Sequence, residues 1–220
     1  MIKDLIYDKN IAFVGPSDYL NNKELGKIID ENDTIIKLNH FETLPIIDYG
    51  SRADIVCCNF HRDLIPHEDV EKQKTKLIMS SHPLEGELLD NLNMRHIKQN
   101  IRTFHKSKDE TYEKITHELY PWKNLEPYYV RLLSKKWNTS GFWMMCLLFS
   151  HLKNIKTLNI YGVDFCFKKY SKEYSNGLGK ITNHDMQYEL TAFKEMYSNK
   201  KHLNKINIID KDFEDYLNKL

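Results

Sequence analysis

Residues 10–20 read NIAFVGPSDYL, an apolar run that stops abruptly on a glycine, a proline and a serine. Ile11–Val14 has the composition of a buried strand. After such a strand, Gly15 would let a ligand approach the backbone, free N–H groups of the turn would suit an anion, and Ser17 could cap the helix behind it. An ordinary strand-to-helix turn is the alternative. The stretch is neither a GxGxxG nor a Walker loop, so a dinucleotide or a nucleoside triphosphate is not favoured.

Short apolar runs alternate with amphipathic stretches along the rest of the chain, without repeats or linkers. This pattern predicts a single α/β domain over residues 1–220, Rossmann-like, with a mostly parallel sheet of about seven strands and helices on both faces. In such sheets ligands bind beyond the carboxyl ends of the strands. The expected strands are Ile11–Val14, Thr34–Leu38, Ile55–Asn59, Leu77–Ser80, Ile101–Phe104, Leu158–Tyr161 and Ile206–Ile209. The expected helices are Lys23–Asp30, Glu85–Asn91, Asp109–Leu119, Phe142–His151, His184–Tyr197 and Phe213–Leu220.

Composition excludes several classes of protein. The 32 basic and 31 acidic residues give a net charge of +1, so no global field attracts nucleic acid or an anionic membrane. No apolar stretch approaches the roughly 20 residues of a membrane span, and the N-terminus lacks a signal-peptide core. The 4 cysteines match neither a disulfide framework nor a zinc site. We expect a cytoplasmic protein that does not span a membrane and binds no nucleic acid, with peripheral membrane attachment left open.

A second stretch, WNTSGFWMMCLLFSHLKNIKTLNIYGVDF over residues 137–165, repeats the arrangement of the first. Thr139, Ser140 and Gly141 open a strongly apolar helix, and the strand behind it ends at Tyr161 and Gly162. Two hydroxyls and a glycine at a helix N-terminus form both a capping arrangement and a site for an oxyanion. Taken alone, the feature is a helix cap.

A third stretch, ITNHDMQYELTAFKEMY over residues 181–197, has apolar residues at helical spacing. The spacing predicts a helix that begins near Thr182 or Asn183, with His184 in its first turn. A helix N-terminus disfavours the imidazolium form, so His184 is a candidate general base. Glu189 lies on a different side of this helix and is expected to support the site from elsewhere. A surface histidine near a helix start is the alternative.

In this order, the three stretches resemble the sialyltransferase superfamily, the eukaryotic-type family 29 glycosyltransferases with sialylmotifs L, S, III and VS. Motif L is matched by Val14-Gly15-Pro16-Ser17, Gly26, Ile29-Asp30, Asp33, Ile35-Ile36, Asn39 and the segment from Asp48 through Gly50 to Asp54. Motif S is matched by Thr139-Ser140-Gly141 and Tyr161-Gly162, and motif VS by His184 and Glu189. Motif III has no clear copy, and Tyr170 and Tyr174 are loose candidates. The chain resembles a bacterial or viral soluble form of the family.

The resemblance implies a Rossmann-like fold of the GT-A variant and an inverting transfer of sialic acid or Kdo. The donor would be the CMP ester of that sugar, the acceptor a hydroxyl of a glycan or lipid-linked saccharide, and no metal or other cofactor would be needed. His184 would take the acceptor's proton. The residues implied to hold the donor are Gly15, Ser17, Asn39, Thr139, Ser140, Gly141, Tyr161 and Gly162.

Two further features bear on the chemistry. The Asp210-Lys211-Asp212 triplet could hold a metal ion, but its place before the last helix favours a helix cap. His61 follows the third expected strand and is expected to support the site at the same sheet edge. Two rival functions remain: a metal-dependent phosphate-transferring enzyme on a similar scaffold, and a non-catalytic nucleotide-binding module.

Overall fold

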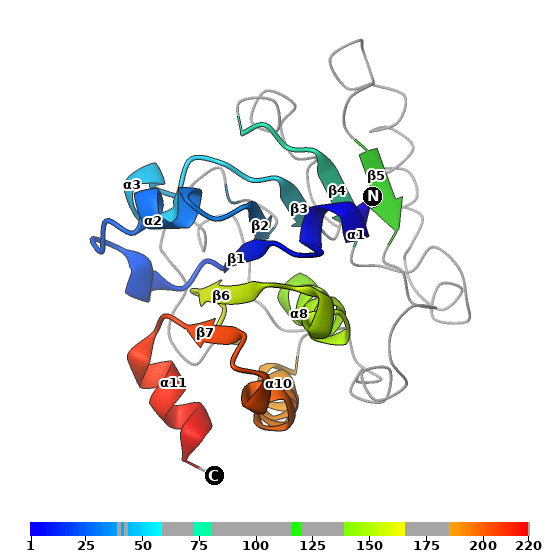
Figure 1. Ribbon diagram of the computed structural model, residues 1–220. Coiled ribbons are helices and arrows are strands. Elements are labelled where there is room, and N and C mark those ends of the chain that lie inside the picture. The colour runs from blue at the N-terminus through cyan, green and yellow to red at the C-terminus, as the bar shows by residue number, and fades with distance from the viewer. Residues whose placement is uncertain are drawn as a thin grey trace.

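The computed structural model describes residues 1–38, 41, 44–58, 73–80, 116–119, 139–165 and 185–219. These residues form one seven-stranded sheet with the strand order β5-β4-β3-β2-β1-β6-β7, and all neighbouring strands are parallel (Figure 1). The strands are β1 (Asn10–Val14), β2 (Thr34–Leu38), β3 (Ile55–Cys58), β4 (Leu77–Ser80), β5 (Thr116–Leu119), β6 (Thr157–Tyr161) and β7 (Ile206–Ile208). The predicted parallel α/β fold is confirmed.

Helices lie on both sides of this sheet. The α-helices are α1 (Ile2–Ile6), α2 (Gly26–Asp30), α3 (Ile46–Tyr49), α8 (Ser140–Ser150), α10 (Met186–Lys200) and α11 (Lys211–Asn218), and short 3-10 helices are η1 (Asp18–Leu20), η5 (Leu152–Asn154) and η6 (Lys201–Leu203). In Figure 1, α2 and α3 lie on one side of the sheet, and α8 and α10 on the other. In the part of the chain that the structure describes, no helix has the length and apolar character to cross a bilayer.

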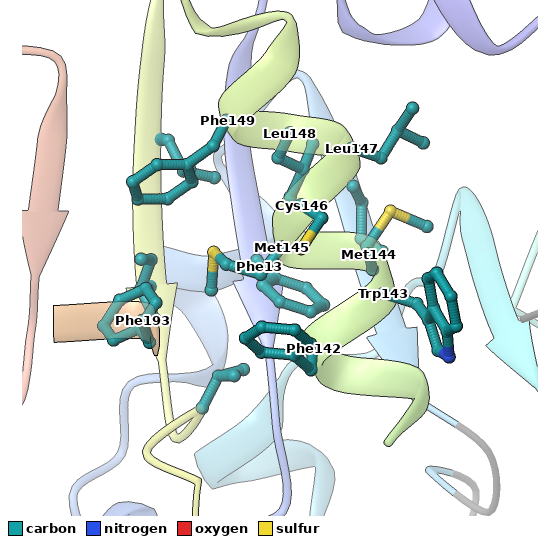
Figure 2. Packing of buried hydrophobic residues seen from close by; sticks show 14 of the residues in the cluster. Phe13, Phe142, Trp143, Met144, Met145, Cys146, Leu147, Leu148, Phe149 and Phe193 are labelled. Carbon is teal, nitrogen blue, oxygen red and sulfur yellow. The ribbon is translucent and has the colours of Figure 1, made fainter. Parts of the chain in front are cut away.

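Helix α8 is the centre of the main core. Its residues from Ser140 to Phe149 are all buried, which is expected for a helix that is apolar on every side. Figure 2 shows Phe13 of β1 beneath α8 and Phe193 of α10 beside it. The rings of Phe149 and Phe193 meet edge to face, with centroids 5.9 Å apart. This packing fixes α8 and α10 against the same face of the sheet.

The strand order reverses between β1 and β6. From β1 the chain adds β2, β3, β4 and β5 outward on one side, and it later adds β6 and β7 on the other side. At this reversal Val14, the last residue of β1, pairs with Tyr161, the last residue of β6. In open α/β sheets such a switch point opens a crevice at the carboxyl ends of the strands, where ligands bind.

Most of the expected strands are observed close to their predicted bounds. β2 and β4 have the predicted bounds, whereas β1 and β6 begin one residue earlier and β3 and β7 end one residue sooner. The helix predicted over Asp109–Leu119 is wrong at its end, since Thr116–Leu119 pairs with β4 as a parallel strand. The strand predicted at Ile101–Phe104 and the helix at Glu85–Asn91 lie outside the described residues.

Candidate active site

The turns after β1 and β6 pack directly against each other. The Gly15 amide donates to Tyr161 O at 2.7 Å, and the Ser17 amide donates to Gly162 O at 3.2 Å. Pro16 has no N–H. The expectation that free N–H groups of this turn face an anion is therefore wrong for Gly15 and Ser17, because both amides are used to join the two turns.

The glycines are required by this close approach. A Cβ atom on Gly15 would lie 2.3 Å from Gly162 O, and one on Gly162 would lie 2.8 Å from Gly15 O. Gly162 also has a φ of +63°, in the left-handed region. The Gly15 and Gly162 positions thus admit no larger side chain without moving the end of β1 or β6.

Ser17 belongs to a buried network behind these turns. Its Oγ donates to Asp164 Oδ2 at 2.7 Å, and both residues are buried. The Tyr49 hydroxyl donates to Ser17 O at 2.8 Å. Since the proton of Ser17 Oγ is committed to Asp164, this hydroxyl can offer a ligand only an acceptor lone pair.

The N-terminus of α8 is held by α10. Thr139 is the N-cap, and its Oγ1 accepts from the Phe142 amide at 3.1 Å. The same hydroxyl donates to Glu189 Oε2 at 2.7 Å, while the Thr139 amide donates to Glu189 Oε1 at 2.6 Å. One carboxylate of α10 therefore binds the backbone and the side chain of the residue that starts α8.

Glu189 is almost completely inaccessible, at 1% exposure. Burial raises the pKa of Glu189 to about 7, while the two hydrogen bonds from Thr139 favour the charged form and oppose this rise. The negative charge of Asp185 raises the pKa further. This carboxyl group changes its protonation state near neutral pH, so the cap that it holds is sensitive to pH.

The strand-to-helix turn at Gly15 and the first helical turn of α8 at Gly141, called here the Gly15 and Gly141 turns, lie beside the same side chain, that of Val163. A Cβ atom on Gly15 would lie 2.7 Å from Val163 Cγ2, and one on Gly141 would lie 3.9 Å from Val163 Cγ1. The Gly141 position would also contact Leu38 Cδ1 at the end of β2, at 3.2 Å. The ends of β1, β2 and β6 and the start of α8 therefore converge at the switch point of the sheet.

The carboxylates that follow β2 in the expected motif L serve the scaffold. Asp48 accepts the amides of Asn22 and Glu24 at 3.0 and 2.9 Å, and both of these residues have positive φ. Asp54 accepts the Ile35 amide at 3.0 Å and pairs with Lys76 Nζ at 2.8 Å. These two carboxylates hold the loop after η1 and the start of β2, so they position the strands that carry the site.

The side chain of Tyr161 makes its hydrogen bond to Asn32, outside the converging turns. Asn32 precedes β2, and the burial of the Tyr161 side chain raises the pKa of Tyr161. Asn32 itself accepts from Asn159 Nδ2 at 2.8 Å. At the site, Tyr161 contributes its carbonyl group, which receives the Gly15 amide.

The Asp210-Lys211-Asp212 triplet forms the predicted cap. Asp210 is the N-cap of α11 and accepts the amides of Asp212 and Phe213 at 3.1 and 3.3 Å. Within the described ranges, His, Cys, Asp and Glu side chains form no cluster of three or more that could hold a metal ion.

The candidate base His184 lies outside the described residues, as do Asn39, His61, Tyr170 and Tyr174. Helix α10 begins at Met186 with Asp185 as its N-cap, and the Asp185 side chain accepts the Tyr188 amide. The predicted start near Thr182 or Asn183 is wrong, because the side chain that caps the helix is Asp185. The expectation that His184 lies in the first turn of this helix therefore loses its basis.

Two residues of the site were missed in the sequence. Val163 and Asp164 directly follow the Tyr161-Gly162 pair; Val163 lies beside Gly15 and Gly141, and Asp164 accepts the Ser17 hydroxyl. The available signal was a carboxylate placed three residues after a buried strand, at the edge where ligands bind.

Comparison with known proteins agrees with this geometry. Residues 9–201 match the profile of glycosyltransferase family 29 (sialyltransferase). No curated protein sequence matches the chain.

Solved structures with the same fold include a mammalian sialyltransferase, with a TM-score of 0.57, 17% identity and coverage of 92% of this chain and 69% of that chain. The α-2,3-sialyltransferase of Campylobacter jejuni in apo form gives a TM-score of 0.55 at 20% identity, over 93% and 76% of the two chains. CstII of the same organism, in complex with the substrate analogue CMP-3FNeuAc, gives a TM-score of 0.53 at 16% identity. The match covers 91% of this chain and 78% of that chain. The chain therefore belongs to glycosyltransferase family 29, the sialyltransferase family, and is a CMP-sugar-dependent glycosyltransferase.

Proposed function

We propose that this protein transfers sialic acid from its CMP ester to a hydroxyl of a glycan acceptor, by direct displacement with inversion and without a metal ion. Kdo, which also travels as a CMP ester, is the alternative donor. The observation that carries the proposal is the convergence of the Gly15 and Gly141 turns on Val163, at the switch point of the sheet. This is where the fold favours a nucleotide.

The start of α8 supports an anionic donor. The positive end of the α8 dipole and the hydroxyl of Ser140 favour a negatively charged group. The Thr139 hydroxyl donates its proton to Glu189, so its part is to hold the start of α8 in place. CMP leaves with a single phosphate, so its charge can be met by hydrogen-bond donors of the chain. Gly15, Gly162 and Asn39 would complete the donor site from the other side.

We assign the general base to His184, on the match to motif VS. The support from the structure is that Glu189 of the same motif contacts Thr139 of motif S, which brings the start of α10 to the proposed donor site. The base would take the proton of the acceptor hydroxyl as its oxygen attacks the anomeric carbon.

Two solved relatives fit this proposal. One mammalian sialyltransferase structure is a complex with Gal-beta-1-3GalNAc-ortho-nitrophenol, and the CstII structure holds CMP-3FNeuAc. A galactose-terminated acceptor and CMP-sialic acid are therefore the first substrates to test. A cytoplasmic location remains a prediction from the sequence.

The test is a transfer assay with CMP-sialic acid, with and without EDTA, on the unaltered chain and two variants. We expect the transfer activity of the unaltered chain to survive EDTA. In His184→Ala we expect the activity to fall roughly hundredfold or more, which is the size of a general-base contribution. The control is His202→Ala, which removes an exposed histidine after the far end of α10 and should keep full activity. Loss of activity in EDTA would contradict the metal-free reaction, and a largely active His184→Ala would remove the assigned base.

A further inference from the structure

The segment from Gly162 to Phe165, which follows β6, begins and ends in an uncommon backbone conformation. Gly162 has a φ of +63° and Phe165 a φ of +52°. The left-handed region is accessible to glycine but strained for a bulky aromatic residue. Such a conformation persists only where the surroundings hold it, and it is found preferentially at functional sites.

The first half of this segment is fixed to the β1 turn. Asp164 accepts the Ser17 hydroxyl at 2.7 Å with both side chains buried, and Gly162 O accepts the Ser17 amide at 3.2 Å. A charged acceptor in a buried setting makes a stronger hydrogen bond than a neutral one. The carboxylate of Asp164 is therefore a main restraint on the direction in which the chain leaves β6.

The second half is fixed to both helices of the core. The Phe165 ring meets Phe142 of α8 edge to face at a centroid distance of 5.9 Å, and it lies 5.0 Å from the ring of Phe193 of α10. Phe142 is in the first turn of α8, directly behind the Thr139 cap. The end of the segment thus packs against the helices that carry motifs S and VS.

Between these two anchors lies Val163, whose side chain reaches the Gly15 and Gly141 positions. Any shift of residues 162–165 would change the spacing between the two turns. The strained segment is therefore the physical link between the part of the site built by β1 and the part built by α8.

We propose that Asp164 is a positioning residue for the donor: by holding residues 162–165 against Ser17, it sets the spacing of the Gly15 and Gly141 turns that receive the CMP moiety. This inference rests on the proposed function. Because preorganised contacts lower the cost of binding, loss of the restraint weakens donor binding, whereas the chemical step and the acceptor site are affected little.

The experiment measures KM for CMP-sialic acid, KM for the acceptor and kcat in Asp164→Ala, Asp164→Asn and Ser17→Ala. We expect Asp164→Ala to raise the donor KM about tenfold, with the acceptor KM and kcat within about threefold. Asparagine keeps an oxygen that accepts the Ser17 proton, so Asp164→Asn should recover most of the donor affinity. The Ser17→Ala/Asp164→Ala double variant should have a donor KM no higher than that of the worse single variant, because each single substitution already removes the same hydrogen bond.

The control is Asp33→Ala. Asp33 is an exposed aspartate that accepts the backbone amide of Asn10 at 2.8 Å, and it precedes β2 at the opposite edge of the sheet, away from the carboxyl ends of the strands. Its donor KM should be unchanged. A donor KM that stays within about twofold in Asp164→Ala, a failure of Asp164→Asn to recover affinity, or additive effects in the double variant would each overturn the positioning role. An unaltered chain that does not use CMP-sialic acid or CMP-Kdo would overturn the proposed function itself, and the inference with it.

Discussion

The buried carboxyl group of Glu189 gives a prediction whose sign and size follow from its environment. Burial raises the pKa of Glu189 from 4.5 to about 7. Over the interval between these values, the unfolded chain has released this proton while the folded chain still holds it. The contribution of Glu189 to stability is therefore full below about pH 4.5, is lost as the pH rises through about 7, and stays lost above.

The magnitude follows from the two pKa values. Between about pH 5 and about pH 8, the free energy of unfolding should fall by about 2–3 kcal/mol through this group alone. Glutamine cannot titrate, so Glu189→Gln should lack this part of the fall. Its amide can still accept the Thr139 amide and donate to the Thr139 hydroxyl, which preserves much of the cap geometry.

The assay is urea unfolding at about pH 5 and about pH 8, with the free energy of unfolding extrapolated to water. The fall with pH should be about 2–3 kcal/mol larger in the unaltered chain than in Glu189→Gln. Glu195→Gln, which changes an exposed carboxylate of the same helix, should keep the pH dependence of the unaltered chain. If the free energy of unfolding falls equally with pH in the unaltered chain and in Glu189→Gln, the reasoning that Glu189 titrates near neutral pH in the folded chain is refuted.

Two other predictions concern the turns and the cap. Gly15→Ala should lose about 2 kcal/mol or more of stability and abolish CMP binding, because its Cβ would meet Gly162 O at 2.3 Å. Gly141→Ala should keep its stability within about 1 kcal/mol, because the closest contact of its Cβ would be with the flexible end of Leu38, at 3.2 Å. Equal losses in the two variants by urea unfolding would contradict this. Asp210→Ala should lower the free energy of unfolding by about 1 kcal/mol in the same assay, because the α11 cap is lost, and should leave the transfer rate unchanged. A loss of transfer activity that depends on added metal would contradict the role of Asp210 as a cap.

The sequence predicted those parts of the fold in which local pattern and tertiary structure agree. The run at Thr34–Leu38 has the composition of a buried strand and pairs on both sides, and its bounds were predicted without error. Thr116–Leu119 carries no such signal and is a strand because its backbone pairs with β4. A strand at the edge of a sheet needs only one neighbour, and the local sequence does not reveal that neighbour.

The site was predicted in its parts but not in its connections. Gly15 was predicted in a strand-to-helix turn and Gly141 at the start of a helix, but the sequence does not show that Gly15 is required by the approach of Gly162. Glu189 was expected to support the site, yet its contact with Thr139 joins residues far apart in the chain. The pairing of Ser17 with Asp164 depends on β1 and β6 being neighbours, which follows from the strand order alone.

Thermal stability in the presence of CMP, UDP, GDP or ATP, each with and without a divalent metal, tests most directly whether the converging turns form a CMP site. A ligand at about 100 times its Kd stabilises the folded chain by about 2.7 kcal/mol, which raises the melting temperature of a chain of this size by about 5–11 °C. We predict this shift for CMP alone and without metal. A shift with UDP and Mn²⁺, or the absence of any shift with CMP, would contradict the assignment of a CMP site.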